Sequence, residues 1–158
     1  MGTRCGQVDP GVVLHLIRQM GMSAEEVENL LYRDSGLKGL SGISNDVREI
    51  EAAGTRDAMR AIDYFVFRTR RELGALTAVL NGLDAFVLAG GIGENAWHIR
   101  EEICSGFEWL GMELDRARNK ANETIISSDR SRVRVFAIST DEEAVIAEHA
   151  SGVLAATG

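Results

Sequence analysis

The chain has 158 residues, of which 45% are hydrophobic and 26% are charged, values that are ordinary for a globular domain with its own core. Its formal net charge of −7 argues against nucleic acid as the main partner, because phosphate backbones select basic surfaces. No apolar run approaches the roughly 20 residues of a membrane helix, and the N-terminus has no apolar signal region. Two distant cysteines, Cys5 and Cys104, lie in no ligand motif, which favours free thiols and a cytoplasmic protein without membrane contact.

Two helices are predicted in the first third of the chain. Asp9 is placed as an N-cap before a proline at the first helical position, so a helix is expected over residues 10–20, ending at Gly21. Residues 23–26 have the pattern of a capping box, which predicts a second helix. Residues 35–44 are rich in glycine and lack periodicity, so they are expected to form a loop.

The middle of the chain is predicted to be helical. Either Asn45 or Asp46 is expected to cap a short helix that runs through Ile50. Apolar residues then recur at helical spacing over residues 58–81, which predicts a long helix that Gly82 ends.

The segment that is chemically most specific covers residues 84–95. It is expected to form a short buried strand over residues 84–89, a tight glycine turn, and a helix from Asn95 to about Leu110. Glycines let a backbone pass close to a bulky anion, and a helix that starts after such a turn directs N–H groups toward it. The pattern therefore indicates a phosphate or nucleotide site. The alternative is a plain strand-to-helix turn with Asn95 as the cap.

The last third predicts a second strand and a final helix. Residues 115–131 are polar and indicate a short helix with a surface loop, whereas residues 132–138 indicate a strand. Ser139 or Thr140 is expected to cap a helix over residues 141–155. This alternation predicts an α/β fold that is rich in helices and has few parallel strands, and two strands are too few for a complete parallel sheet.

Several short motifs follow one another along the chain. They are Met1–Gly6 with Val8–Gly11, Ser35–Leu37 with Gly42–Arg48, Ala89–Asn95 followed by Ile99 and Arg100, and Thr140–Glu143. In this order and spacing they resemble the acetokinase family, which includes acetate, propionate and butyrate kinases. The resemblance covers essentially the whole chain and is to the C-terminal portion of these enzymes, which are more than twice as long.

The resemblance implies a fold and a reaction. Residues 1–158 would be the C-terminal part of a nucleotide-binding domain, a partial ribonuclease-H-like domain of the ATPase fold shared by actin, sugar kinases and heat-shock chaperones. The N-terminal domain and the first strands would be absent. The implied reaction, part of organic acid metabolism, transfers the γ-phosphoryl group of ATP to acetate or propionate and gives an acyl phosphate.

The resemblance also implies cofactors and partners. The cofactors would be ATP or ADP with Mg²⁺, and the partners a short-chain carboxylate and a second copy of the chain in a homodimer. A separately encoded N-terminal half is left open as a further partner. The alternative function is a non-catalytic nucleotide-binding or dimerisation module left by truncation.

Arg4 matches an essential arginine of the family. Its forked guanidinium suits a phosphoryl group in transfer, and the alternative is a surface arginine near a frayed terminus. Asp46, Val47 and Arg48 fall where the family contacts adenosine. The alternative there is a capping aspartate beside a solvated arginine.

Gly91, Ile92, Gly93, Glu94 and Asn95 are expected to line the nucleotide, by their backbone more than by their side chains. For Glu94, a position facing solvent or a role at the positive end of a helix is an equally good interpretation.

Glu142 matches the carboxylate that the family associates with magnesium, with Glu143 next to it. Mg²⁺ is commonly held by one or two carboxylates, water and substrate phosphates. The alternative for Glu142 is a capping role at a helix start. Arg4, the glycine turn and Glu142 are together expected to converge around one triphosphate.

Overall fold

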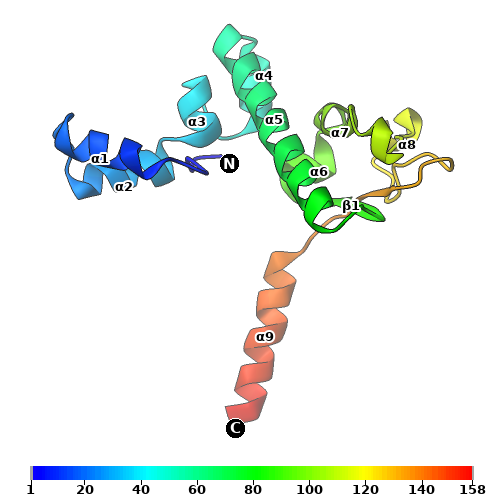
Figure 1. The fold of residues 1–158 in the computed structure, drawn as a ribbon. Helices are drawn as coiled ribbons and strands as arrows, with labels where there is room; N and C mark the ends of the chain where they lie inside the picture. The colour runs from blue at the N-terminus through cyan, green and yellow to red at the C-terminus, as the bar shows by residue number, and fades with distance from the viewer. Residues whose placement is uncertain (1, 158) are drawn as a thin grey trace. The chain divides into compact units, whose positions relative to one another are not determined.

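The computed structural model describes residues 2–157, with the side chains of Glu142 and residues 155–157 left outside the description. The chain divides into two compact units, Met1–Leu73 and Gly74–Gly158, and each is described here by itself (Figure 1). Among the described residues, no helix is both long enough and apolar enough to span a membrane.

The first unit is built from helices. They are α1 (Pro10–Arg18), α2 (Ala24–Arg33), α3 (Gly36–Ser41), α4 (Val47–Ala53) and α5 (Arg56–Val79), whose last residues belong to the second unit. The predicted caps of the first two helices are confirmed: the Asp9 side chain accepts from the Gly11 N–H, and Ser23 and Glu26 form a reciprocal capping box. Helices α1 and α2 lie side by side (Figure 1).

The loop expected over residues 35–44 is wrong, because most of this segment is helix α3. Leu37 anchors the helix with only 2% of its surface exposed. A Cβ atom added to Gly39 would lie 2.6 Å from the main-chain oxygen of Asp34. The glycine is therefore required by the close approach of α3 to the end of α2, whereas the sequence pattern treats it as a helix breaker.

The second unit contains a small parallel sheet. Its elements are β1 (Ala85–Leu88), α6 (Gly90–Asn95), α7 (Trp97–Cys104), a 3₁₀ turn (Glu108–Leu110), α8 (Arg116–Lys120), β2 (Arg134–Ala137) and α9 (Glu142–Thr157). Strand β1 pairs with β2 in parallel, with Ala85 opposite Arg134 and Leu88 opposite Ala137. The prediction of few, parallel strands is confirmed. The expectation of a buried first strand is wrong, since Leu88 is the one buried residue of β1.

Strand β2 has partners along both edges. On the edge away from β1, the Ile126 N–H donates to the Val135 oxygen at 2.9 Å and the Ala137 N–H donates to the Thr124 oxygen at 3.0 Å. Ile126 and Val135 are both fully buried. The expectation that residues 115–131 form a short helix is confirmed by α8, but the surface loop behind it is wrong in part, because these residues contribute to the core.

The helix expected from Asn95 to Leu110 is replaced by three shorter elements. The glycine turn is itself helix α6, and Asn95 is its last residue instead of the cap of the next helix. Ala96, with ψ 75°, breaks the helical path before α7 begins at Trp97. The sequence has no glycine or proline at this break, so it could not be predicted from residue types.

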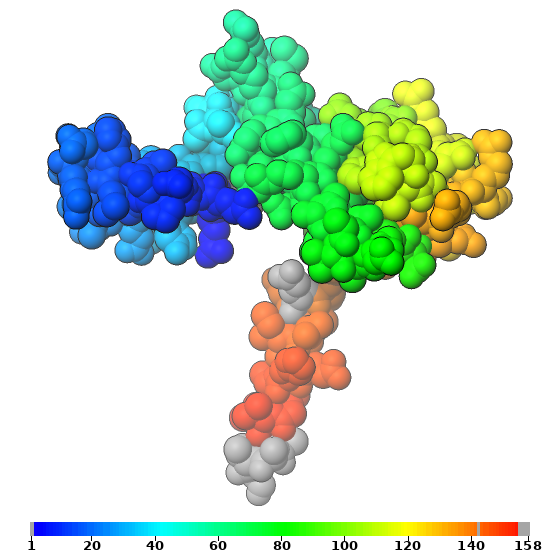
Figure 2. Space-filling view, viewed as in Figure 1, coloured from blue at the N-terminus to red at the C-terminus, as the bar shows by residue number. Residues whose placement is uncertain are grey.

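Helix α9 starts one residue later than expected and has a different cap. The Asp141 carboxylate accepts from the Ala144 N–H at 2.9 Å, so Asp141 replaces Ser139 or Thr140 as the N-cap. Every side chain of α9 that the structure describes is exposed (Figure 2). Its apolar residues are thus outside the core of the second unit.

Candidate functional site

Arg4 lies on an extended segment that is fixed in the first unit. The Cys5 N–H donates to the Leu31 oxygen at 2.9 Å, and the Ser35 N–H donates to the Thr3 oxygen at 2.9 Å. These bonds tie both neighbours of Arg4 to the end of α2 and the start of α3. The backbone around Arg4 is therefore held in place and not frayed, whereas its side chain lies at the surface, as the alternative for Arg4 expected. Its exposed guanidinium carbon lies 5.3 Å from the centre of the Tyr32 ring.

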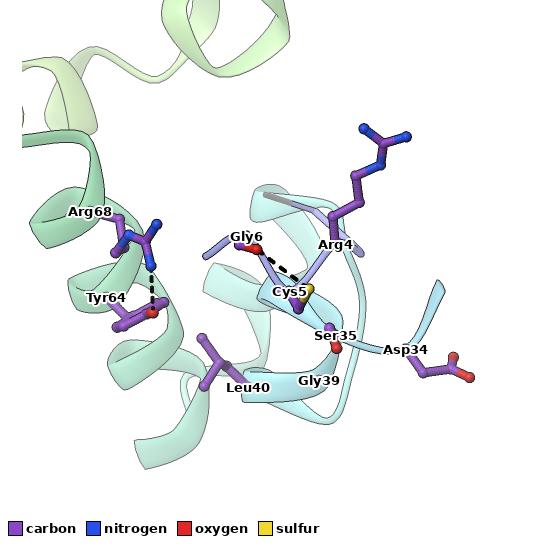
Figure 3. Close-up of a pocket in the computed structure, with 10 residues that line it drawn as sticks. Arg4, Cys5, Gly6, Asp34, Ser35, Gly39, Leu40, Tyr64 and Arg68 are labelled. Carbon is purple, nitrogen blue, oxygen red and sulfur yellow. Dashed lines mark hydrogen bonds between the residues drawn. The ribbon is translucent and has the colours of Figure 1, made fainter. Parts of the chain in front are cut away.

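A cavity of about 350 Å³ lies beside this segment, entirely within the first unit (Figure 3). Its lining residues are Arg4, Cys5, Gly6, Asp34, Ser35, Gly36, Gly39, Leu40, Tyr64 and Arg68. The carboxylate in this lining, that of Asp34, is paired with Lys38 at 2.6 Å. Two arginines thus border the cavity without a free carboxylate among the lining residues.

Of the two candidates, Asn45 and Asp46, the N-cap of α4 is Asp46. Its carboxylate accepts from the Arg48 N–H at 2.9 Å and from the Arg48 guanidinium at 2.6 and 3.1 Å. The hydrogen bonds from Arg48 hold the pKa of the Asp46 carboxyl below its ordinary value. Arg48 is exposed and Val47 is buried. The geometry gives Asp46 a structural role and leaves the outer face of the Arg48 guanidinium open to a ligand.

The structural reason for a glycine differs among the three glycine positions of α6. Gly90 has φ +71°, a conformation that favours glycine. A Cβ atom on Gly93 would lie 3.0 Å from the carbonyl carbon of Leu88, so this glycine lets α6 approach β1. Gly91 is exposed, and a Cβ atom there would meet nothing within 4 Å. The fold therefore does not explain the absence of a side chain at Gly91, and the space over it is open.

A buried arginine holds the C-terminal end of α6 in place. Arg100 on α7 is fully buried, and its guanidinium donates to the main-chain oxygens of Gly93 at 2.9 Å and Glu94 at 2.7 Å. It also donates to Asn119 and Asn122 at 2.6–2.7 Å, so all five N–H groups have acceptors. Burial lowers the pKa of the Arg100 guanidinium. Arg100 thereby fixes the backbone of the expected nucleotide turn.

Glu94 connects α6 to the segment between β2 and α9. Its carboxylate accepts from the Thr140 N–H at 3.1 Å. Hydrogen bonds from the Thr140 main chain and the Ser139 side chain hold the pKa of Glu94 below its ordinary value. The structure thus brings residues 91–95 close to the start of α9, which carries Glu142. The side chain of Glu142 itself lies outside the described residues.

The expected site residues fall into both units. Arg4, Asp46, Val47 and Arg48 belong to the first, and residues 91–95 belong to the second with Glu142. Two buried arginines, Arg68 and Arg100, were missed as functional candidates. The signal for Arg100 was its place between Ile99 and Ile103, where a charge interrupts the apolar face of a helix.

Comparison with known proteins decides the family. A model described as the Acetokinase family matches residues 1–148. The chain belongs to the acetokinase family. It is 63% identical over 154 residues to a protein named acetate kinase from Methylocella silvestris, a match that covers 98% of this chain and 38% of that relative. The chain therefore spans about two-fifths of the length of the curated relatives it matches.

Solved structures of this family have the same fold. An acetate kinase from Porphyromonas gingivalis superposes with a TM-score of 0.89 at 38% identity, covering 98% of this chain and 40% of that one. A propionate kinase from Francisella tularensis gives a TM-score of 0.84 at 39% identity, and the match covers 92% of this chain and 38% of that one. The helix-rich architecture with a small parallel sheet is thus also that of the matched part of these acetokinase-family structures.

Proposed function

We propose that the chain is part of a cytoplasmic carboxylate kinase that transfers the γ-phosphoryl group of ATP to acetate or propionate. It would correspond to the C-terminal, nucleotide-side part, a partial ribonuclease-H-like domain, of an acetokinase-family enzyme. Two copies of the enzyme would form a dimer. The observation that carries the proposal is Gly91. A Cβ atom at Gly91 would meet nothing within 4 Å, and Arg100 holds the end of the helix α6 that carries this glycine. The chain is also 63% identical to a protein named acetate kinase.

The residues proposed to contact the nucleotide are residues 91–95 and those at the start of α4. The backbone of residues 91–95 would follow the phosphates, because Arg100 fixes two of its carbonyls and the surface over Gly91 is free. Arg48, held by the Asp46 carboxylate, would lay its exposed guanidinium plane on the adenine base. Val47 is buried and would contribute by shaping the start of α4.

Arg4 would contact the phosphoryl group in transfer. A guanidinium stays charged and binds two oxygens at once, which suits a group whose charge is spread over three equatorial oxygens. The Arg4 backbone is held on both sides by main-chain hydrogen bonds, so the side chain starts from a fixed point. Phosphoryl transfer depends mainly on such positioning and on electrostatic stabilisation.

Glu142 would hold Mg²⁺ together with nucleotide phosphates and water. In the part of the chain that the structure describes, no cluster of three or more metal-ligating side chains occurs. Mg²⁺ is usually bound by one or two carboxylates plus phosphates and water instead of a complete protein cage. When bound, the ion neutralises charge on the β- and γ-phosphates. Glu94 would orient the start of α9, where this carboxylate is attached.

Calorimetric titration of the full chain with ADP, with and without Mg²⁺, tests the metal assignment. We expect Mg²⁺ to strengthen ADP binding in the wild type and in Glu143→Ala, and this increment to disappear in Glu142→Ala. An increment that survives in Glu142→Ala would contradict the assignment.

The chain alone should give no hydroxamate from acetate, ATP and hydroxylamine. Rapid hydroxamate formation would contradict the proposal that essential positioning groups lie outside it.

A further inference from the structure

Arg68 on α5 is a buried cation that the proposed function does not use. It is 9% exposed, and its Nη1 donates to the Tyr64 hydroxyl at 3.2 Å. Its Nε is buried without a hydrogen-bond acceptor among the described residues. An unsatisfied N–H on a buried charged group is costly, and such groups in native proteins require an explanation.

The charge of Arg68 is only weakly compensated within the first unit. The carboxylate paired with it, that of Glu72, lies 4.0 Å from Nη2 and is half exposed. That same carboxylate is 2.7 Å from Arg71, which takes the closer interaction. Buried charges in proteins are usually paired at hydrogen-bond distance. Arg68 therefore has unused capacity for an anion.

The cavity described above borders this side chain. Arg68 forms one wall with Tyr64, and the Cys5–Gly6 segment lies across from them (Figure 3). Gly6 has φ +71°, and a Cβ atom there would lie 3.4 Å from Nη2 of Arg68, so the glycine keeps a side chain away from the guanidinium. Asp34 is paired with Lys38, so the other charged side chains of the lining, Arg4 and Arg68, are both positive, although the whole chain carries −7.

We propose that this cavity binds a small oxyanion, a carboxylate or phosphate group, with Arg68 as its positive group. The forked guanidinium matches the geometry of such oxygens. The site is distinct from the proposed role of Arg4, whose guanidinium points away from Cys5 and Gly6 and lies over Tyr32 (Figure 3). It requires no phosphoryl transfer, so it stands or fails separately from the proposed kinase function.

Cys5 lines the cavity and provides a local probe. We would measure its alkylation by iodoacetamide, a neutral reagent, in the full chain at fixed ionic strength with added phosphate, acetate or chloride. Cys104 monitors unfolding in the same sample, because burial raises the pKa of its thiol to about 12 and leaves it unreactive. We expect phosphate or acetate, but not chloride, to slow Cys5 alkylation with saturation. Protection by one anion alone identifies the ligand class, and protection by both supports the shared chemistry.

Variants of two arginines on α5 assign the effect. Arg68→Met should abolish the protection, and Arg68→Lys should raise the half-saturating concentration by about tenfold or more. The matched control Arg60→Met removes an arginine that is exposed and outside the cavity lining, and it should behave as the wild type. If Arg68→Met unfolds, the half-saturating anion concentrations of Arg68→Lys and the wild type still test the proposal. The proposal is overturned if neither anion protects the wild type with saturation, or if protection is unchanged in the folded Arg68 variants.

Discussion

Arg100 and Asn119 are joined through both the side chain and the main chain of the asparagine. Arg100 Nε donates to Asn119 Oδ1 at 2.7 Å, and Arg100 Nη2 donates to the Asn119 main-chain oxygen at 2.6 Å. The Asn119 amide in turn donates to the Trp97 oxygen at 2.8 Å, and both Arg100 and Asn119 are fully buried. This pair connects α7 and α8. Because Arg100 also donates to the main-chain oxygens of Gly93 and Glu94, a buried charge fixes the backbone of α6, the proposed nucleotide turn.

Replacing Arg100 by lysine should destabilise the chain by about 3 kcal/mol or more, since breaking a buried charged network leaves several acceptors unsatisfied. An ammonium has three donors and no fork, so it cannot replace five N–H groups. Urea unfolding measures the change. The control Arg130→Lys alters an exposed arginine and should change stability by less than about 0.5 kcal/mol. Equal small effects of both substitutions would contradict the role given to Arg100.

Gly39→Ala should destabilise the first unit, because the added Cβ atom would lie 2.6 Å from the Asp34 oxygen. We expect a loss of about 1–3 kcal/mol in the free energy of unfolding, as for other forced contacts in packed regions. The matched control is Gly74→Ala in α5, where a Cβ atom meets nothing within 4 Å. It should stabilise the chain by about 0.4–1 kcal/mol. Thermal unfolding of both variants distinguishes them, and stabilisation by Gly39→Ala would refute the close approach.

Glu94→Gln should weaken the link between α6 and the start of α9 in a manner that depends on pH. The pKa of Glu94 is lowered from 4.5 in the folded chain, so the carboxylate stabilises the fold above about pH 4.5. This contribution is lost as the pH falls through the lowered pKa. The difference in melting temperature between the wild type and Glu94→Gln should therefore shrink between about pH 7 and pH 3. The control Glu102→Gln on α7 is expected to show a smaller change, and a difference for Glu94→Gln that is independent of pH would contradict the assignment.

Local signals in the sequence predicted the starts of three helices. Asp9 and Ser23 cap their helices as expected, and Asp46 is the one of two candidates that caps α4, because a capping side chain bonds to an N–H only two or three residues away. Parallel pairing followed from the alternation of strands and helices. These features depend on neighbours in the sequence or on general rules of chain connection.

The parts that sequence reasoning missed depend on contacts between distant residues. Helix α3 was missed because it contains glycines. Gly39 is needed there because the helix lies close to Asp34 at the end of α2. The burial of Arg100 depends on Asn119 and Asn122, which lie 19 and 22 residues away. The site residues were named from a family motif, and their proposed convergence on one nucleotide stays a prediction.

The open surface over Gly91 is proposed to receive a nucleotide. Calorimetric titration with Mg-ADP of the wild-type chain, Gly91→Trp and the control Gly152→Trp tests it most directly, since a Cβ atom at either glycine meets nothing within 4 Å. We expect saturable binding by the wild type and Gly152→Trp, and binding at least about tenfold weaker by a folded Gly91→Trp. Equal affinity for Mg-ADP in Gly91→Trp and the wild type, or no binding by the wild type, would contradict it.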